Sequence, residues 1–285
     1  MTKKEITNLS ASIFNKLFAL ARKEGRDFND VLMRYLQERF LYRLSVSDYK
    51  NKFILKGGFM LTVIDLPASR PTMDIDFAAK QIKNDIAGVE AAFKEICAVK
   101  TAEDDAVIFD ATSIKGESIM EATDYNGIRI KLKAKLGNSI TPMKFDVGFG
   151  DVITPKTRTA ALPAMLGLPQ PILSIYPLET VIAEKLSAMA EHSLTNSRMK
   201  DFYDVYMILT KFDLKLDTLK TAINKTFENR GIALSKDFVI FKEDFYKTKQ
   251  AQWELFLNNN KLNEADINNF EKVIKTIQKH LGTIL

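Results

Sequence analysis

Strict alternation over nine residues is the sequence feature that most constrains the fold. Ile128, Ile130, Leu132, Ala134 and Leu136 alternate with Arg129, Lys131, Lys133 and Lys135. Because successive side chains of a strand point to opposite faces, this segment predicts a strand with one buried face. The basic side chains form either a solvated sheet face that discourages edge pairing or a cationic strip near a polyanion.

Neighbouring segments extend this sheet and surround it with helices. Strand-like patterns occur within residues 52–64, 70–80, 106–116 and 143–151, and helical periodicity occurs over 10–25, 27–44 and 85–100. Five prolines between 154 and 177 mark the clearest boundary, after which the sequence is almost wholly helical. We therefore predict an α+β fold, with a mixed sheet and flanking helices in 1–155 and a helical domain in 156–285.

Composition excludes several classes of protein. The chain has 285 residues, of which 46% are apolar, and a formal charge of +5, which is ordinary for a globular protein with a substantial core. A single cysteine and two histidines leave no intramolecular disulfide and no zinc site of several imidazoles, so a bound metal would need oxygen ligands. No secretory signal or membrane-spanning run is recognised, and we expect a cytoplasmic protein without membrane contact.

Three aspartates lie within apolar segments that are predicted to form strands. Asp74 and Asp76 are two residues apart and therefore share one face of a strand, whereas Ile75 and Phe77 share the other. Asp146, between two apolar residues, would add a carboxylate from a second strand. Three such carboxylates could hold Mg²⁺, although strand-end aspartates can also cap turns or face water.

A glycine pair precedes these aspartates. Gly57 and Gly58 follow a short apolar strand, at a turn where backbone N–H groups can approach a phosphate closely, although an ordinary turn is the alternative. Arg70 and Thr72 lie just before the acidic pair and either contact phosphate or shape the loop.

The helical half contributes charges on apolar helix faces. Lys185 shares a face with Val181, Ile182 and Met189, and Asp201 lies on the apolar stripe of the next helix. These two residues either form a buried ion pair or direct a cation at nucleotide phosphates. Arg198, just before the second helix, would add to such a cationic site.

The order of these motifs resembles a known family. The segments FLYRLSVSDYKNKFILKGGFML, RPTMDIDFAAK, KFDVGFGD, YPLETVIAEKLSAM and NSRMKDFYDVY resemble the AbiEii-type nucleotidyltransferase toxins, which are related to the MenT toxins within the DNA polymerase beta superfamily. Gly58 stands where the wider superfamily usually has serine, which leaves Thr72 or backbone N–H groups to contact phosphate. Residues 212–285 match none of these motifs, and we expect them to face substrate or partner.

The resemblance implies a polymerase-beta-like fold that binds a nucleotide between an α/β core and a helical lobe. It implies a nucleotidyltransferase toxin of a toxin–antitoxin or abortive-infection (phage-defence) system, which uses an NTP and Mg²⁺ to modify tRNA and is neutralised by a separately encoded antitoxin. Asp74, Asp76 and Asp146 would then hold metal, and Lys185 and Asp201 match the family's later essential lysine and aspartate. The alternatives are transfer to a protein or small molecule, a non-catalytic NTP-binding toxin or regulator acting on a protein partner, and a metal-dependent nuclease.

Overall fold

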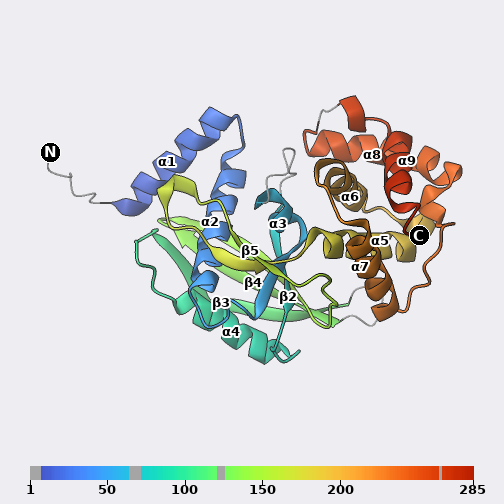
Figure 1. The fold of residues 1–285 in the computed structure, drawn as a ribbon. Coiled ribbons are helices and arrows are strands. Elements are labelled where there is room, and N and C mark those ends of the chain that lie inside the picture. Colours follow the sequence, from blue (N-terminus) through green and yellow to red (C-terminus); the bar gives the residue numbers. More distant parts are fainter. Residues whose placement is uncertain (1–7, 64–71, 121–125, 263–264) are drawn as a thin grey trace. The chain divides into compact units, whose positions relative to one another are not determined.

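The chain divides into two compact units in a computed structural model. The structure describes residues 8–63, 72–120, 126–262 and 265–285. The first unit comprises Met1–Leu55, Thr72–Gly150 and Thr159–Ile175; the second comprises Lys56–Pro71, Asp151–Arg158 and Tyr176–Leu285. Each unit is therefore assembled from segments that are distant in the sequence (Figure 1).

A seven-stranded sheet organises the described residues of the first unit. Its strand order is β3-β4-β5-β2-β1-β7-β6. The strands are β1 Phe53–Lys56, β2 Asp74–Ala79, β3 Val107–Met120, β4 Asn126–Leu136, β5 Ser139–Gly148, β6 Arg158–Ala161 and β7 Ile172–Ile175. Strands β3, β4 and β5 are antiparallel neighbours, whereas β2 pairs with β5, and β1 with β7, in parallel. The predicted mixed sheet of an α+β fold is confirmed.

Strand β4 has one buried apolar face and one basic face, as its alternating sequence predicts. All five apolar side chains from Ile128 to Leu136 are buried, and the basic side chains between them point to the opposite face. Two of those cations pair with acidic residues of the edge strand β3, because Lys131 contacts Glu117 at 2.8 Å and Lys135 contacts Asp110 at 3.1 Å. This part of the basic strip is thus a solvated sheet face with paired charges.

Helices cover the apolar face of the sheet. Helix α2 (Phe28–Ser45) and helix α4 (Ile86–Ala98) contribute Phe40 and Phe93, whose rings are 5.3 Å apart. Both rings also contact Phe145 of β5, at 4.4 and 5.1 Å. Burial of aromatic side chains provides much of the hydrophobic stabilisation of such a core. This packing turns the apolar face inward and leaves the opposite face to polar side chains.

Helix α1 ends, and helix α2 begins, at residues suited to those positions. Helix α1 (Leu9–Glu24) ends at Gly25, whose φ of 63° is the left-handed conformation that glycine adopts easily. Asp27 then accepts a hydrogen bond from the Asn29 N–H at 2.7 Å and caps α2. Helix α2 is buried nearly all round, because Gln37, Glu38, Arg39 and Arg43 are inaccessible as well as its apolar residues.

The proline-rich segment contains two strands that the sequence pattern did not predict. Strands β6 and β7 have four residues each, and β7 pairs with β1 through Leu55 and Ile175, which are 120 residues apart. A four-residue strand has too few alternations to be recognised locally, and its pairing partner is distant in the sequence. The segment therefore returns the chain to the sheet before the helical part begins.

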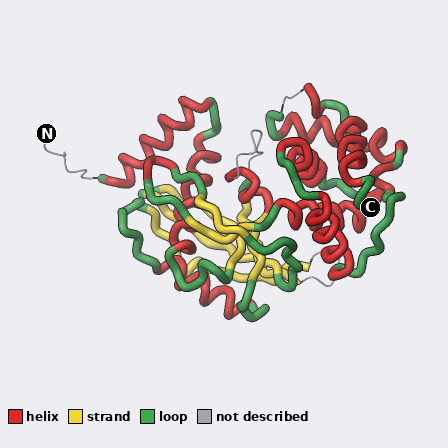
Figure 2. Tube along the Cα trace, in the orientation of Figure 1, coloured by secondary structure: helices red, strands yellow, loops and turns green. Residues whose placement is uncertain are grey.

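Helices make up most of the second unit, whereas the strands belong mainly to the first (Figure 2). The α-helices of the second unit are α3 Gly57–Val63, α5 Leu178–His192, α6 Met199–Lys211, α7 Leu216–Asn229, α8 Glu243–Asn259 and α9 Phe270–Leu281. Short 3₁₀ helices occur at Met165–Gly167 in the first unit and at Ser193–Thr195, Val239–Phe241 and Ala265–Ile267 in the second.

Helix α5 packs against α6 and α7, and α9 packs against α6 and α8. The buried Trp253 of α8 stacks on Phe270 at the start of α9, with ring centroids 4.9 Å apart. None of the described helices is long and apolar enough to cross a bilayer.

Candidate active site

The three predicted strand aspartates lie on one face of the sheet. Asp74 and Asp76 are partly exposed on β2, whereas Ile75 and Phe77 between and after them are fully buried. Asp76 is the register partner of Asp146 on the parallel strand β5, and paired residues of neighbouring strands point to the same side. The predicted orientation of these carboxylates is confirmed, and we call Asp74, Asp76 and Asp146 the acidic face.

Arg129 of β4 binds one member of the acidic face. Its Nε donates to Asp146 Oδ1 at 2.8 Å and its Nη2 donates to Oδ2 at 2.7 Å. The hydrogen bond to Asp146, together with the nearby charges of Asp146 and Asp74, raises the pKa of the Arg129 guanidinium despite its partial burial. The sequence pattern assigned Arg129 to the basic strip of β4 and did not predict this pair, because it depends on the register Arg129↔Asp146 between two strands.

The acidic face has the ligand chemistry of a magnesium site. Mg²⁺ prefers carboxylate oxygens, and three carboxylates from two paired strands provide them on a partly solvated surface. In residues 8–63, 72–120, 126–262 and 265–285, no three acidic, histidine or cysteine side chains are gathered into a ready-made metal site. Asp146 is directed at Arg129 instead, so the donor set fits Mg²⁺ but its third carboxylate is bound to a protein cation.

The glycine pair begins helix α3 directly after β1. Gly57 has a φ of 69°, in the left-handed region where a Cβ atom is strained, so the turn itself requires glycine at this position. Of the residues predicted to lie before the acidic pair, Arg70 falls outside the described residues. Thr72 is described, and its hydroxyl donates to the Asp74 carbonyl at 3.3 Å, while Gln37 donates to the Thr72 and Met73 carbonyls.

Lys185 and Asp201 form an ion pair within the second unit, which is one of the two alternatives that the sequence left open. Lys185 Nζ lies 2.7 Å from Asp201 Oδ1, and also 2.8 Å from Asp204 Oδ2. Arg198 Nε binds the second oxygen of Asp201 at 2.6 Å and remains 42% exposed. Asp204 was not predicted, although its position three residues after Asp201 on the same helix is a recognisable signal.

The cations of this cluster keep the Asp201 carboxyl ionised. Burial alone would raise the pKa of the Asp201 carboxyl, but the neighbouring Lys185 and Arg198 outweigh burial and lower it well below the usual range. Asp201 is therefore ionised at neutral pH and holds Lys185 from one side. The two oxygens of Asp201 bind different cations, so Lys185 and Arg198 are positioned by the same carboxylate.

A second, partly buried charge cluster in the same unit was not predicted. Lys56, immediately before Gly57, binds Asp151 Oδ2 at 2.6 Å and Glu184 Oε2 at 3.4 Å. The Tyr176 hydroxyl donates to Asp151 at 2.7 Å and lies 3.2 Å from Glu184. Burial and the two carboxylates raise the pKa of Tyr176 well above its ordinary value, and burial also raises the pKa of Glu184. This network connects the start of the glycine turn to α5, the helix that carries Lys185.

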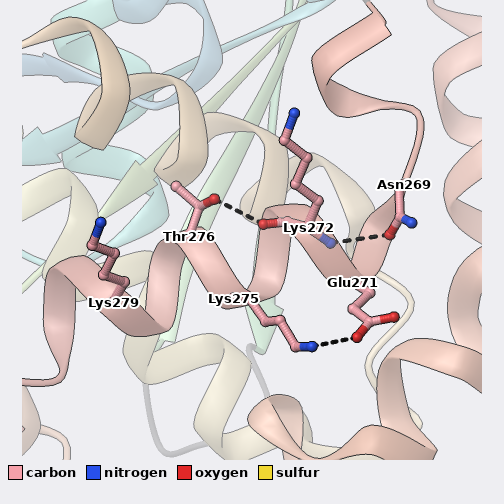
Figure 3. Close-up of a pocket in the computed structure, with 6 residues that line it drawn as sticks. All are labelled: Asn269, Glu271, Lys272, Lys275, Thr276 and Lys279. Atoms are coloured by element: carbon pink, nitrogen blue, oxygen red, sulfur yellow. Dashed lines mark hydrogen bonds and ion pairs between the residues drawn. The ribbon is translucent and has the colours of Figure 1, made fainter.

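A shallow depression on α9 lies apart in sequence from all predicted site residues (Figure 3). It is lined by Asn269, Glu271, Lys272, Lys275, Thr276 and Lys279. Lys275 pairs with Glu271 on the same helix, and Lys272 pairs with Asp266 at 2.7 Å. Because these lysines are exposed and already paired with acids, the depression has the character of a solvated helix face.

Comparison with solved structures defines the class of fold. Over 90% of its length, the chain superimposes on a candidate nucleotidyltransferase from H. pylori with a TM-score of 0.50 and 16% identity, covering 95% of that chain. It also superimposes on JHP933 from Helicobacter pylori with a TM-score of 0.51 and 15% identity, over 90% of this chain and 92% of that one. At these identities the likeness shows the fold alone. No curated protein matches the chain.

The family model narrows the class to one family. The model described as "Nucleotidyl transferase AbiEii toxin, Type IV TA system" matches residues 39–276. The chain therefore belongs to the AbiEii family of nucleotidyltransferase toxins. The match extends beyond the motifs, which lie between residues 39 and 207. It also includes helices α7 and α8 and part of α9, which contain none of these motifs.

Proposed function

We propose that this protein is a toxin that transfers a nucleotide from an NTP to tRNA, with Mg²⁺ as cofactor, in the cytoplasm. The observation that carries the proposal is the acidic face, where Asp74, Asp76 and Asp146 share one partly exposed side of the sheet. Membership of the AbiEii family supports the reaction class and a cognate, separately encoded antitoxin. The resemblance to the MenT toxins supports tRNA as acceptor, and the net charge of +5 permits contact with a polyanionic substrate.

Each charged group of the proposed site has a distinct task. Asp74 and Asp76 would hold one Mg²⁺ at the triphosphate, and Asp146 would help to hold a second. When bound, such ions neutralise charge on the attacking and leaving oxygens of an in-line displacement at the α-phosphorus. By the family resemblance, Gly57, Gly58, Arg70 and Thr72 would contact phosphate oxygens of the nucleotide.

By the family resemblance, Lys185 and Arg198 would supply positive charge for the pyrophosphate that leaves. Both cations are bound to Asp201, which orients them and carries a charge of its own. Arg198 is the more exposed of the two and suits a phosphate, because its planar guanidinium can donate two parallel hydrogen bonds.

The test is a transfer assay with a matched aspartate control. Purified protein would be incubated with each α-³²P-labelled NTP, Mg²⁺ and total tRNA, in parallel with Asp76→Ala and Asp110→Ala. We expect label on tRNA with the wild type and with Asp110→Ala, whose aspartate lies on β3 and pairs with Lys135. Asp76→Ala should lose transfer by more than about 100-fold, since it removes a metal-binding group, with little change in thermal stability.

Other outcomes would contradict parts of the proposal. Transfer by Asp76→Ala at the wild-type rate would overturn the site. Label on a protein would replace tRNA as the acceptor, and NTP binding without transfer would indicate a non-catalytic toxin. RNA fragments released without any NTP would indicate a nuclease.

A further inference from the structure

Arg129 occupies both oxygens of a carboxylate that the proposed function assigns to metal. The two hydrogen bonds to Asp146, at 2.8 and 2.7 Å, form the paired geometry in which a guanidinium matches a carboxylate. Lone pairs that accept these hydrogen bonds are not available to a divalent cation at the same time. Either the metal shares Asp146 with Arg129, or one cation displaces the other.

The neighbouring strands show that this pairing differs from the rest of the basic strip. Lys131 and Lys135 pair with Glu117 and Asp110 on the edge strand β3, away from the acidic face. Arg129 instead pairs inward, on β5, with a member of the acidic face, and its guanidinium also interacts electrostatically with Asp74. A protein cation is thus placed where the proposed reaction requires a metal ion.

We propose that Arg129 is a positioning residue that holds Asp146 in the metal-free protein and competes with the divalent cation for it. The proposal rests on the proposed function for the assignment of Asp146 to metal. The Arg129 side chain is 33% exposed and that of Asp146 is 23% exposed, so the pair is partly solvated and can exchange. Competition of this kind sets the metal concentration at which Asp146 becomes available.

Metal binding without nucleotide tests the proposal directly. The probe is Mn²⁺ alone, titrated into the full chain and followed by the electron paramagnetic resonance signal of free Mn²⁺. We expect Arg129→Gln to bind Mn²⁺ about threefold to fivefold more tightly than the wild type, the range that a partly exposed charge pair provides. Arg129→Lys retains the charge but lacks the planar fork, and its affinity should lie between the two.

A matched control separates competition from simple removal of positive charge. Lys144 is the exposed register partner of Asp74 on β5, so Lys144→Gln removes one charge from the same face without freeing Asp146. Lys144→Gln should change Mn²⁺ affinity by less than about twofold at physiological salt. In an Asp146→Asn background, Arg129→Gln should give no increase, because the contested ligand is gone.

Three results would overturn the proposal: no tightening in Arg129→Gln, equal tightening in Lys144→Gln, or tightening that persists in the Asp146→Asn background. Thermal unfolding and circular dichroism of each variant confirm that the comparison is made on folded protein. The assay is independent of nucleotide transfer. If Arg129→Gln tightens Mn²⁺ binding and no NTP is transferred, the proposed function fails and the role of Arg129 stands; transfer with unchanged Mn²⁺ affinity gives the reverse.

Discussion

Lys185 Nζ lies 2.7 Å from Asp201 Oδ1, in an ion pair that joins α5 to α6 inside the second unit. The Asp201 side chain is 1% exposed, so the attraction acts in a region with little water to screen it. The same carboxylate binds Arg198 through its other oxygen. Removal of the Asp201 charge would take one ionic partner from each of Lys185 and Arg198, although Lys185 would retain its contact with Asp204.

Asp201→Asn should therefore lower stability in a pH-dependent way. The pKa of Asp201 is lowered on folding, so its contribution is fully present above the unfolded pKa of about 4 and is lost as pH falls below that value. We expect a cost of about 3 kcal/mol at pH 7. The gap to the wild type should shrink by roughly 1 kcal/mol at pH 3. Urea unfolding of both proteins at pH 7, 5, 4 and 3 measures this, and a gap that does not vary with pH would contradict it.

Lys56→Met should destabilise the second unit, because it removes the ammonium group that binds both Asp151 and Glu184. We expect a loss of about 3 kcal/mol at neutral pH, because two largely buried carboxylates lose the cation that they share. The pKa of Glu184 is already raised by burial and should rise further. A raised carboxyl pKa favours the folded state at low pH, so the loss should be smaller at pH 5 than at pH 8.

Tyr176→Phe is the matched control for Lys56→Met. It removes the hydroxyl bonded to the same two carboxylates but retains the ammonium group. We expect a cost of about 1 kcal/mol, typical of a lost hydrogen bond. Chemical denaturation of both variants at the two pH values provides the comparison. A Tyr176→Phe variant as unstable as Lys56→Met would mean that the hydroxyl, and not the cation, holds the network.

Local patterns in the sequence were sufficient to predict much of the fold. The alternation along 128–136 and the placement of Asp74 and Asp76 opposite Ile75 depend on neighbours within a few residues. Strands β6 and β7 could not be predicted in this way, because their short apolar runs are recognisable only when paired with a distant strand.

The candidate site shows the same division between local and distant information. Lys185 and Asp201 were predicted as partners because each carries a charge on an apolar helix face. Arg129 was predicted only as part of a basic strip, and Lys56 was assigned no role from the sequence. Their partners, Asp146 and Asp151, are set by strand register and by folding of the chain over 95 residues, which no local pattern contains.

Serine substitutions at the two glycines should have different effects. Gly57 has a φ of 69°, where a Cβ atom is strained, so Gly57→Ser should cost about 1 kcal/mol and lower the melting temperature by roughly 2 °C or more. Gly58 is not among the glycines with positive φ, and serine there matches the wider superfamily, so Gly58→Ser should change the melting temperature by less than about 1 °C. Thermal unfolding checks both; an equal loss in the two variants would contradict this account of the turn.

Burial should decide the cost of breaking two ion pairs that have similar distances. Arg43 donates two hydrogen bonds to Asp105, at 2.7 and 2.9 Å, and both side chains are buried, so Asp105→Asn should cost about 3 kcal/mol by leaving a buried guanidinium uncompensated. Lys131 binds Glu117 at 2.8 Å, but the two side chains are 49% and 39% exposed, so Glu117→Gln should cost at most about 0.5 kcal/mol. Guanidinium chloride unfolding of the two variants measures both costs. Comparable losses would contradict the conclusion that burial sets the cost of breaking each pair.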